Sequence, residues 1–226
     1  MERKVDFIID ERYHLFSRGV EKRKIFLDKK DYERFFALLY ILNQENHFHV
    51  SNFLNKGQGN ISDLYKQKRS NSLVAIHAYC LMPNHFHLVV QEIKEKGISK
   101  FLAKLLTSYS MYFNIKYERS GPLFVRPFRS EHIDNDRYFK HIFNYVHFNC
   151  LELYETDWKE IGIKNKKGAE GFINNYRYSS YFDFRKPKER IESQILDLSL
   201  LSPHLSRTPL DISDIESLRD LTGLLN

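Results

Sequence analysis

The sequence predicts an α+β protein in which helices pack on an antiparallel sheet. Short runs with the composition of strands alternate with longer segments whose apolar residues recur every three or four positions. Two of the short runs are separated only by a turn, as in a hairpin. Of the 226 residues, 42% are hydrophobic and only nine are Gly and six Pro, so the chain can bury the core of one substantial domain.

The first predicted elements are a strand and a helix. Residues 13–18 (YHLFSR) form a short strand-like run that ends at Gly19. Residues 31–44 (DYERFFALLYILNQ) have the apolar spacing of one helical face, which predicts a helix. Residues 51–72 are polar and contain two glycines, so we expect a loop there.

A strand pair and a long helix are predicted next. Residues 73–82 (LVAIHAYCLM) and 85–91 (HFHLVVQ) have strand composition, and the Pro83-Asn84 pair between them is a turn signal. Residues 98–117 have one apolar helical face, and the sequence SGP that follows at 120–122 would end that helix.

One more strand and one more helix complete the order. Residues 123–133 (LFVRPFRSEHI) are strand-like, and residues 135–153 are expected to be helical, with Asp134 or Asn135 as the cap. Strand, helix, strand pair, helix, strand, helix is consistent with a ferredoxin-like arrangement. After about residue 155 the pattern weakens. We therefore expect a core domain over residues 1–154 and a partly helical C-terminal extension over 155–226, packed on the core or trailing from it.

Charge and cysteine content narrow the function classes. The net charge of +6 and the isoelectric point near 9.1 favour an anionic partner, and nucleic acid is the commonest one. Cys80 and Cys150 have no framework spacing, which fits two packed thiols in a reducing compartment, although one disulfide stays open. No signal peptide and no run of 18 apolar residues is visible, so we expect a cytoplasmic protein with no membrane partner.

The sequence NHFH occurs twice, at residues 46–49 and 84–87, and two histidines that flank one residue can clamp a metal ion. His47 and His49 lie next to a polar segment that contains glycine, so two ordinary loop histidines are the simpler interpretation. The second copy lies between a turn and an apolar run and is the better candidate.

Strand geometry supports the second copy. His85 and His87 would point to the same face of a strand, with Cα atoms roughly 6.5–7 Å apart at about 3.3 Å rise per residue. Phe86, Leu88 and Val90 would then face the core on the opposite side. The alternative is that the two histidines are only the half-exposed polar face of a strand.

With the segment MPNHFHLVV at residues 82–90 in view, the sequence resembles the single-tyrosine HUH transposases (IS200-like transposases), and most closely their REP-associated branch. In that family a hydrophobic strand ends in Met-Pro-Asn-His-x-His, and the two histidines bind a divalent metal. The similarity spans residues 11–184. Its other matching residues are Tyr13, His14, Arg18, Gly19, Lys22 to Lys24, Tyr109, Asn114, Tyr117, Ser120 to Phe124, Arg126, Arg129, Tyr145 to Asn149, and Tyr178 to Tyr181.

The resemblance implies an HUH endonuclease-type core over residues 1–154 that cleaves single-stranded DNA containing a hairpin. Tyr145 would attack a phosphodiester to give a 5′-phosphotyrosine link and a free 3′-OH, which can later rejoin strands. His85 and His87 would bind the metal, with Asn149 as a third ligand. The ion is either Mg²⁺ or Mn²⁺: Mg²⁺ prefers oxygen ligands, whereas imidazole suits Mn²⁺ better.

Helical spacing alone makes one further residue a candidate for this site. Tyr145 and Asn149 are four positions apart on one helical face, at the edge of an apolar stripe. His141 shares that face, so it is a rival ligand or acid–base group. Packing at the edge of the core is the alternative interpretation of Tyr145.

A nucleic-acid site also needs cations that neutralise phosphates. The alternative for each of them is an ordinary solvated surface charge. The candidates are Arg18, Lys22, Arg23, Arg126 and Arg129.

One departure from the family pattern leaves three functions open. The family commonly has Pro after the Asn, then a basic residue and Ala, whereas CLEL follows Asn149 here. We expect the helix to continue and the contact of the basic residue to be lost. The chain is then an active transposase, a catalytically inactive domesticated DNA-hairpin-binding protein, or a metal-dependent nuclease that uses water. Some relatives exchange the tyrosine helix in a dimer, but the long C-terminal extension makes us favour a monomer over a homodimer.

Overall fold

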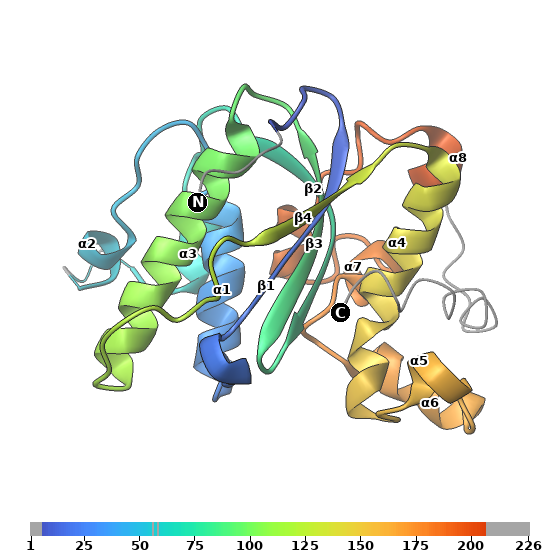
Figure 1. Cartoon of the computed structure of the whole chain (residues 1–226). Coiled ribbons are helices and arrows are strands. Elements are labelled where there is room, and N and C mark those ends of the chain that lie inside the picture. Colours follow the sequence, from blue (N-terminus) through green and yellow to red (C-terminus); the bar gives the residue numbers. More distant parts are fainter. Residues whose placement is uncertain (1–5, 56, 58, 207–226) are drawn as a thin grey trace.

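A four-stranded antiparallel sheet lies between two groups of helices (Figure 1). The structure is a computed structural model that describes residues 6–55, 57 and 59–206. The strand order β2-β3-β1-β4 is that of a ferredoxin-like sheet, so the predicted α+β class is confirmed. The strands are β1 (Arg12–Arg18), β2 (Val74–Met82), β3 (His85–Glu92) and β4 (Arg129–Ile133).

The two faces of β3 have different surroundings. The Pro83-Asn84 turn joins β2 and β3 into the predicted hairpin. Phe86, Leu88 and Val90 are fully buried in the core on one face. Because side chains alternate along a strand, His85 and His87 point to the other face. There, Phe16 pairs with His87 and Arg18 with His85 in the β1–β3 register.

Two helices cover the first face. Helix α1 (Lys29–Ile41) and helix α3 (Gly97–Lys116) lie side by side against the sheet (Figure 1). Both were predicted, but α1 begins earlier because Asp28 caps it: the Asp28 side chain accepts a hydrogen bond from the Asp31 backbone at 3.1 Å. Buried Asp31 also binds Lys116 at 2.7 Å, which ties α1 to α3.

Helix α4 (Asp136–Phe148) covers the second face. Its cap is Asn135, whose side chain accepts a hydrogen bond from the Tyr138 backbone at 2.8 Å. The predicted apolar stripe of this helix is confirmed as fully buried. Its members are Phe139, Ile142, Phe143 and Val146. Tyr145 lies beside this stripe.

Three sequence predictions about elements were partly wrong. Residues 51–72 contain a short helix, α2 (Val50–Asn55), and a 3-10 turn, η2 (Ser62–Lys66), which packs on α1 through buried Leu64 and Tyr65. Strand β4 covers only the second half of residues 123–133, since Pro127 has no N–H for the ladder. The predicted helix 135–153 changes after Phe148 into a 3-10 turn, η3 (Asn149–Leu153).

The part of the C-terminal segment that the structure describes binds the edge strand β2. Leu81 N donates to Tyr178 O at 2.8 Å, and Ser180 N donates to Tyr79 O at 2.9 Å. The rest of the predicted extension, residues 207–226, lies outside the described residues. None of the described helices is long and apolar enough to cross a membrane. The remaining elements are η1 (Val20–Lys22), α5 (Trp158–Ile161), α6 (Lys166–Asn175), α7 (Tyr181–Arg185), η4 (Ile191–Ile195) and α8 (Pro203–Ser206).

Candidate active site

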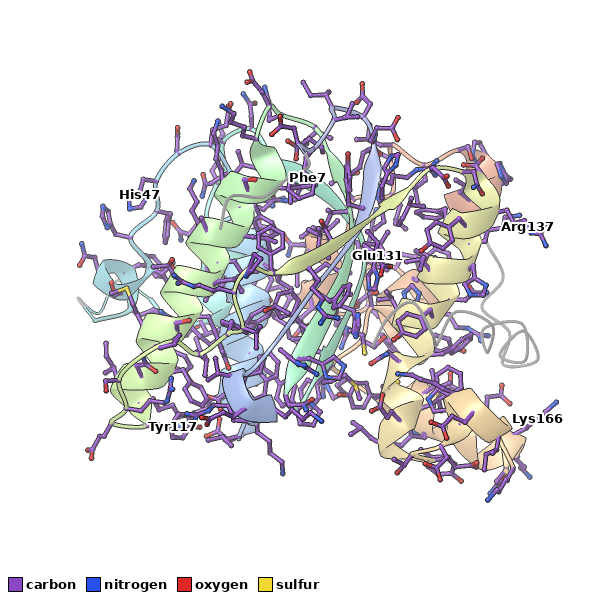
Figure 2. The ribbon with its side chains drawn as sticks, viewed as in Figure 1. Phe7, His47, Tyr117, Glu131, Arg137 and Lys166 are labelled. Atoms are coloured by element: carbon purple, nitrogen blue, oxygen red, sulfur yellow. The ribbon has the colours of Figure 1, made fainter. Side chains whose placement is uncertain are left out.

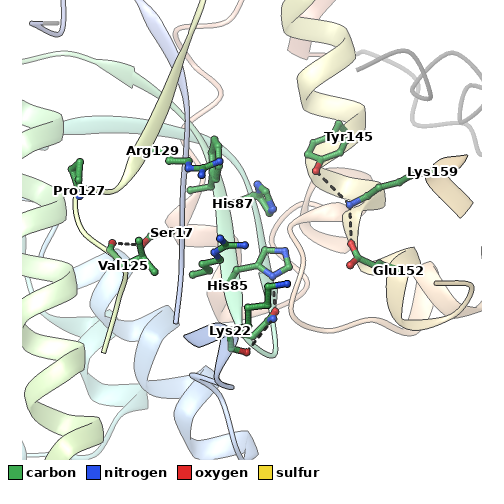
Figure 3. Close-up of a pocket in the computed structure, with 13 residues that line it drawn as sticks. Ser17, Lys22, His85, His87, Val125, Pro127, Arg129, Tyr145, Glu152 and Lys159 are labelled. Carbon is green, nitrogen blue, oxygen red and sulfur yellow. Dashed lines mark hydrogen bonds and ion pairs between the residues drawn. The ribbon is translucent and has the colours of Figure 1, made fainter. Parts of the chain in front are cut away.

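A cavity of about 310 Å³ lies between the sheet and α4 (Figure 3). Its walls come from β1, the turn after β1, the start of β3, the segment before β4, α4 and the C-terminal segment. The fold therefore gathers side chains that are far apart in the sequence. Six residues predicted for the site line it: Arg18, Lys22, His85, His87, Arg129 and Tyr145.

His85 presents an unprotonated nitrogen to Asn149. The ring centroids of His85 and His87 are 5.0 Å apart, as expected for neighbours on one strand face. His85 Nδ1 lies 2.7 Å from Asn84 Oδ1, which only accepts, so Nδ1 carries the proton in the neutral ring. His85 Nε2 then has a lone pair, and it lies 3.3 Å from Asn149 Oδ1. Two acceptors that face each other are an arrangement that a cation would bridge.

The imidazole of His87 is oriented by a hydrogen-bonded chain. His14 Nδ1 lies 3.4 Å from Glu131 Oε2, and His14 Nε2 lies 2.9 Å from His87 Nδ1. The carboxylate accepts from His14 Nδ1–H, so His14 Nε2 accepts from His87 Nδ1–H. His87 Nε2 is thereby left with its lone pair. Glu131, the first member of this hydrogen-bonded series, lies on β4 (Figure 2) and pairs with His14 in the strand register. A partner on the second nitrogen is typical of metal-binding histidines.

Burial keeps both candidate ligands neutral. Desolvation lowers the pKa of His85 to about 4, although Glu152 opposes the shift. The pKa of His87 lies well below its usual value because the ring is buried and lies near His85 and His14. Neutral imidazole is the form that binds a metal ion.

The residues present fit a divalent ion. His85, His87 and Asn149 offer two imidazoles and one amide oxygen, a donor set that suits Mn²⁺ better than Mg²⁺. Asn149 is fully buried, and its Nδ2 has no hydrogen-bond partner in the described part of the chain. The residues that the structure describes contain no cluster of three His, Cys, Asp or Glu that could hold a metal, so the third candidate ligand beside the two histidines is the Asn149 amide, as predicted.

Tyr145 lies against this histidine pair. Its ring packs edge-on against His87, with centroids 5.6 Å apart, and only 4% of the residue is exposed. Its hydroxyl lies 3.5 Å from Lys159 Nζ, which also binds Glu152 Oε2 at 2.7 Å (Figure 3). Burial raises the pKa of Tyr145, and the Lys159 charge opposes that shift.

Sequence reasoning missed Lys159 and Glu152. Lys159 lies fourteen positions after Tyr145, in a segment with weak periodicity, so no spacing links the two. Glu152 is part of the departure from the family pattern after Asn149. The turn η3 brings it to the cavity wall, where it pairs with Lys159.

The structure places other candidates away from the cavity. Arg23 forms an ion pair with Glu21 at 2.9 Å, and neither Arg23, Arg126 nor His141 lines the cavity. The exposed His47 lies near α2, on the far side of α1 and α3 (Figure 2). Cys80 and Cys150 are both buried as free thiols.

Comparisons with known proteins agree with this fold and with the sequence resemblance. The family model described as transposase IS200-like matches residues 51–149, a segment that includes β2, β3, α3, β4 and all of α4. A solved structure of a REP-associated tyrosine transposase bound to a REP hairpin superposes with a TM-score of 0.50 at 11% sequence identity. The match covers 85% of this chain and 90% of that one, and at this identity the likeness shows the fold alone. No curated protein matches the chain. Over residues 51–149, a little under half of its length, the chain is thus similar to the IS200-like transposases.

Proposed function

We propose that this protein is a metal-dependent DNA transposase that cleaves and rejoins single strands through Tyr145. The observation that supports this most strongly is the convergence on one cavity of a tyrosine, a histidine pair and four cationic side chains from separate elements. The similarity of residues 51–149 to the IS200-like transposases supports the same reaction class.

The proposed reaction conserves the energy of the phosphodiester bond. The Tyr145 oxygen attacks phosphorus, and the bond between phosphorus and the 3′-oxygen breaks. The products are a 5′-phosphotyrosine link and a free 3′-OH. The phosphotyrosine link retains the energy of the broken phosphodiester bond. A 3′-OH can therefore attack this link later and rejoin strands without an external energy source.

The basic residues of the cavity would hold the DNA backbone. Arg18, Lys22 and Arg129 reach it from β1, from the turn after β1 and from β4. Such residues neutralise phosphates and set the position of the strand, without reading its sequence.

The histidine pair and the amide of Asn149 would hold a divalent ion beside Tyr145. When bound, such an ion supplies Lewis-acid polarisation of a phosphoryl oxygen. The protein contributes neutral, oriented imidazoles: the chain from Glu131 through His14 keeps His87 Nε2 unprotonated.

The proposed substrate is single-stranded DNA that contains a hairpin, bound by a monomer. The neighbouring solved transposase was captured with a REP hairpin, and the basic cavity wall of this chain suits a DNA backbone. The second candidate, an inactive hairpin-binding protein, is favoured by the departure after Asn149, which places the Glu152 carboxylate on the cavity wall, where it would repel a phosphate placed for attack by Tyr145. The ion pair of Glu152 with Lys159 reduces that repulsion.

A covalent trap tests the proposal. The protein is incubated with labelled single-stranded oligonucleotides that include hairpins, in Mg²⁺ and separately in Mn²⁺, and is separated on a denaturing gel. We expect an adduct with the wild type and none with Tyr145→Phe or His85→Ala. Cleaved DNA in the Tyr145→Phe lane would instead indicate a nuclease that uses water. Tight hairpin binding without adduct or cleavage would indicate the inactive binding protein.

A further inference from the structure

Lys159 lies beside the Tyr145 hydroxyl, although it is not part of residues 51–149, which match the family model. Its Nζ lies 3.5 Å from the Tyr145 hydroxyl and 5.3 Å from the centroid of the Tyr145 ring. All three members of the Tyr145–Lys159–Glu152 group line the cavity. In Figure 3 the Lys159 ammonium lies between the phenol and the carboxylate.

We propose that Lys159 is a catalytic residue, which donates a hydrogen bond to the Tyr145 oxygen as negative charge develops there, and that Glu152 positions its ammonium. This assignment rests on the proposed tyrosine chemistry. It adds a second function to the C-terminal segment, which otherwise packs on β2 and α1.

The surroundings of Lys159 suit a hydrogen-bond donor better than a base. Its side chain is 20% exposed and its carboxylate partner 38% exposed. Burial lowers the pKa of Lys159, but Tyr145 and Glu152 together raise it above its usual value. The amine is therefore an ammonium at neutral pH. Of its three N–H groups, one faces Glu152 and one faces Tyr145.

A purely structural ion pair explains these contacts less well. An exposed or half-exposed pair contributes little to stability, and nothing in such a pair requires the ammonium to reach a tyrosine. The phenol is buried and carries negative charge once it loses its proton for the attack, which is costly without a nearby cation. A fixed donor aimed at an oxygen that gains charge is a common source of catalytic stabilisation.

The step balances in atoms, electrons and protons. A bond forms between the Tyr145 oxygen and phosphorus, and the bond between phosphorus and the 3′-oxygen breaks. The electron pair of the broken bond stays on the 3′-oxygen. The phenol proton passes to water, and the 3′-oxygen takes a proton from water. Lys159 keeps its protons throughout, so it can stabilise the same oxygen again when the phenolate leaves during rejoining.

The test separates the chemical step from DNA binding. The probe is the labelled pool of single-stranded hairpin oligonucleotides, and the full-length wild type is compared with Lys159→Met and Lys159→Arg. Lys167→Met is the matched control, because Lys167 is an exposed lysine of α6 that does not line the cavity. Two quantities are measured: the rate of adduct formation at saturating DNA in Mn²⁺, and the dissociation constant of uncleaved DNA in a Tyr145→Phe background.

We expect Lys159→Met to slow adduct formation about 10²-fold, as loss of one donor to a charged oxygen does, with the DNA dissociation constant changed less than about threefold. Lys159→Arg should recover part of the rate, and Lys167→Met should match the wild type. An unchanged rate in Lys159→Met would overturn the assignment and leave the tyrosine chemistry intact, as would a loss confined to DNA affinity. Absence of an adduct in the wild type would overturn the tyrosine chemistry itself, and this assignment with it.

Discussion

Loss of the hydrogen bond between His14 and His87 should weaken metal binding by a predictable amount. His14 is fully buried, and its Nε2 lies 2.9 Å from His87 Nδ1. In His14→Leu, the Nδ1–H of His87 has no acceptor there, and a buried unpaired donor costs about 1–3 kcal/mol. His87 can avoid that cost by moving its proton to Nε2, but it then loses the lone pair that would bind the ion.

Whether His87 keeps its proton on Nδ1 or moves it to Nε2, a similar loss of metal affinity is expected. Removal of such a partner typically weakens metal binding about 10–100-fold, which is about 1.4–2.8 kcal/mol at 1.4 kcal/mol per factor of ten. Glu131→Gln should lose less, since the amide oxygen can still accept from His14. The assay is calorimetric titration of the DNA-free protein with Mn²⁺, which requires no catalysis.

The control for this experiment is His132→Leu. His132 lies on the same strand as Glu131, but it is exposed and binds Glu11 outside the cavity. Its Mn²⁺ affinity should equal that of the wild type. If folded His14→Leu protein, verified by its circular dichroism and melting curve, binds Mn²⁺ as tightly as the wild type, the role assigned to the His14 chain is refuted.

Three further predictions concern stability and DNA binding. Burial lowers the pKa of His147 to about 3; because the unfolded chain takes up this proton near pH 6.5, the free energy of unfolding should fall as pH drops from about 6.5 towards 3. His147→Gln should flatten that fall in urea titrations, and an unchanged slope would contradict the assignment. Asn135→Ala removes the α4 cap and should cost about 1 kcal/mol in the same titrations; a loss of less than a few tenths would show that the cap contributes nothing. Arg129→Ala should weaken hairpin binding and reduce its salt slope by about 1, whereas Arg23→Ala, outside the cavity, should change both less; equal effects would exclude the cavity as the phosphate site.

The sequence alone was sufficient for the elements with strong periodicity. The apolar stripe of α4 and the alternation along β3 each determine a buried face, so spacing predicts on which face Tyr145 and the histidine pair lie. Their proposed roles come only from the family resemblance. Local signals also located the β2–β3 turn and narrowed the α4 cap to Asp134 or Asn135, of which the structure shows Asn135.

Contacts between distant segments could not be predicted in this way. The pairing of His14 with Glu131 depends on the β1–β4 register, and the contact of Lys159 with Tyr145 depends on how the segment after η3 folds back. Neither has a periodic signal. The turn η2 was missed because only Leu64 and Tyr65 are buried in a polar stretch, too few for a helical face.

The most direct test of the proposed mechanism is to locate the covalent bond. The wild-type adduct is digested with protease and nuclease, and the peptide that retains a nucleotide phosphate is sequenced by mass spectrometry. The chain has 14 tyrosines, so the result discriminates among many positions. We predict the phosphate on Tyr145; an adduct on any other residue would contradict the proposed role of the cavity.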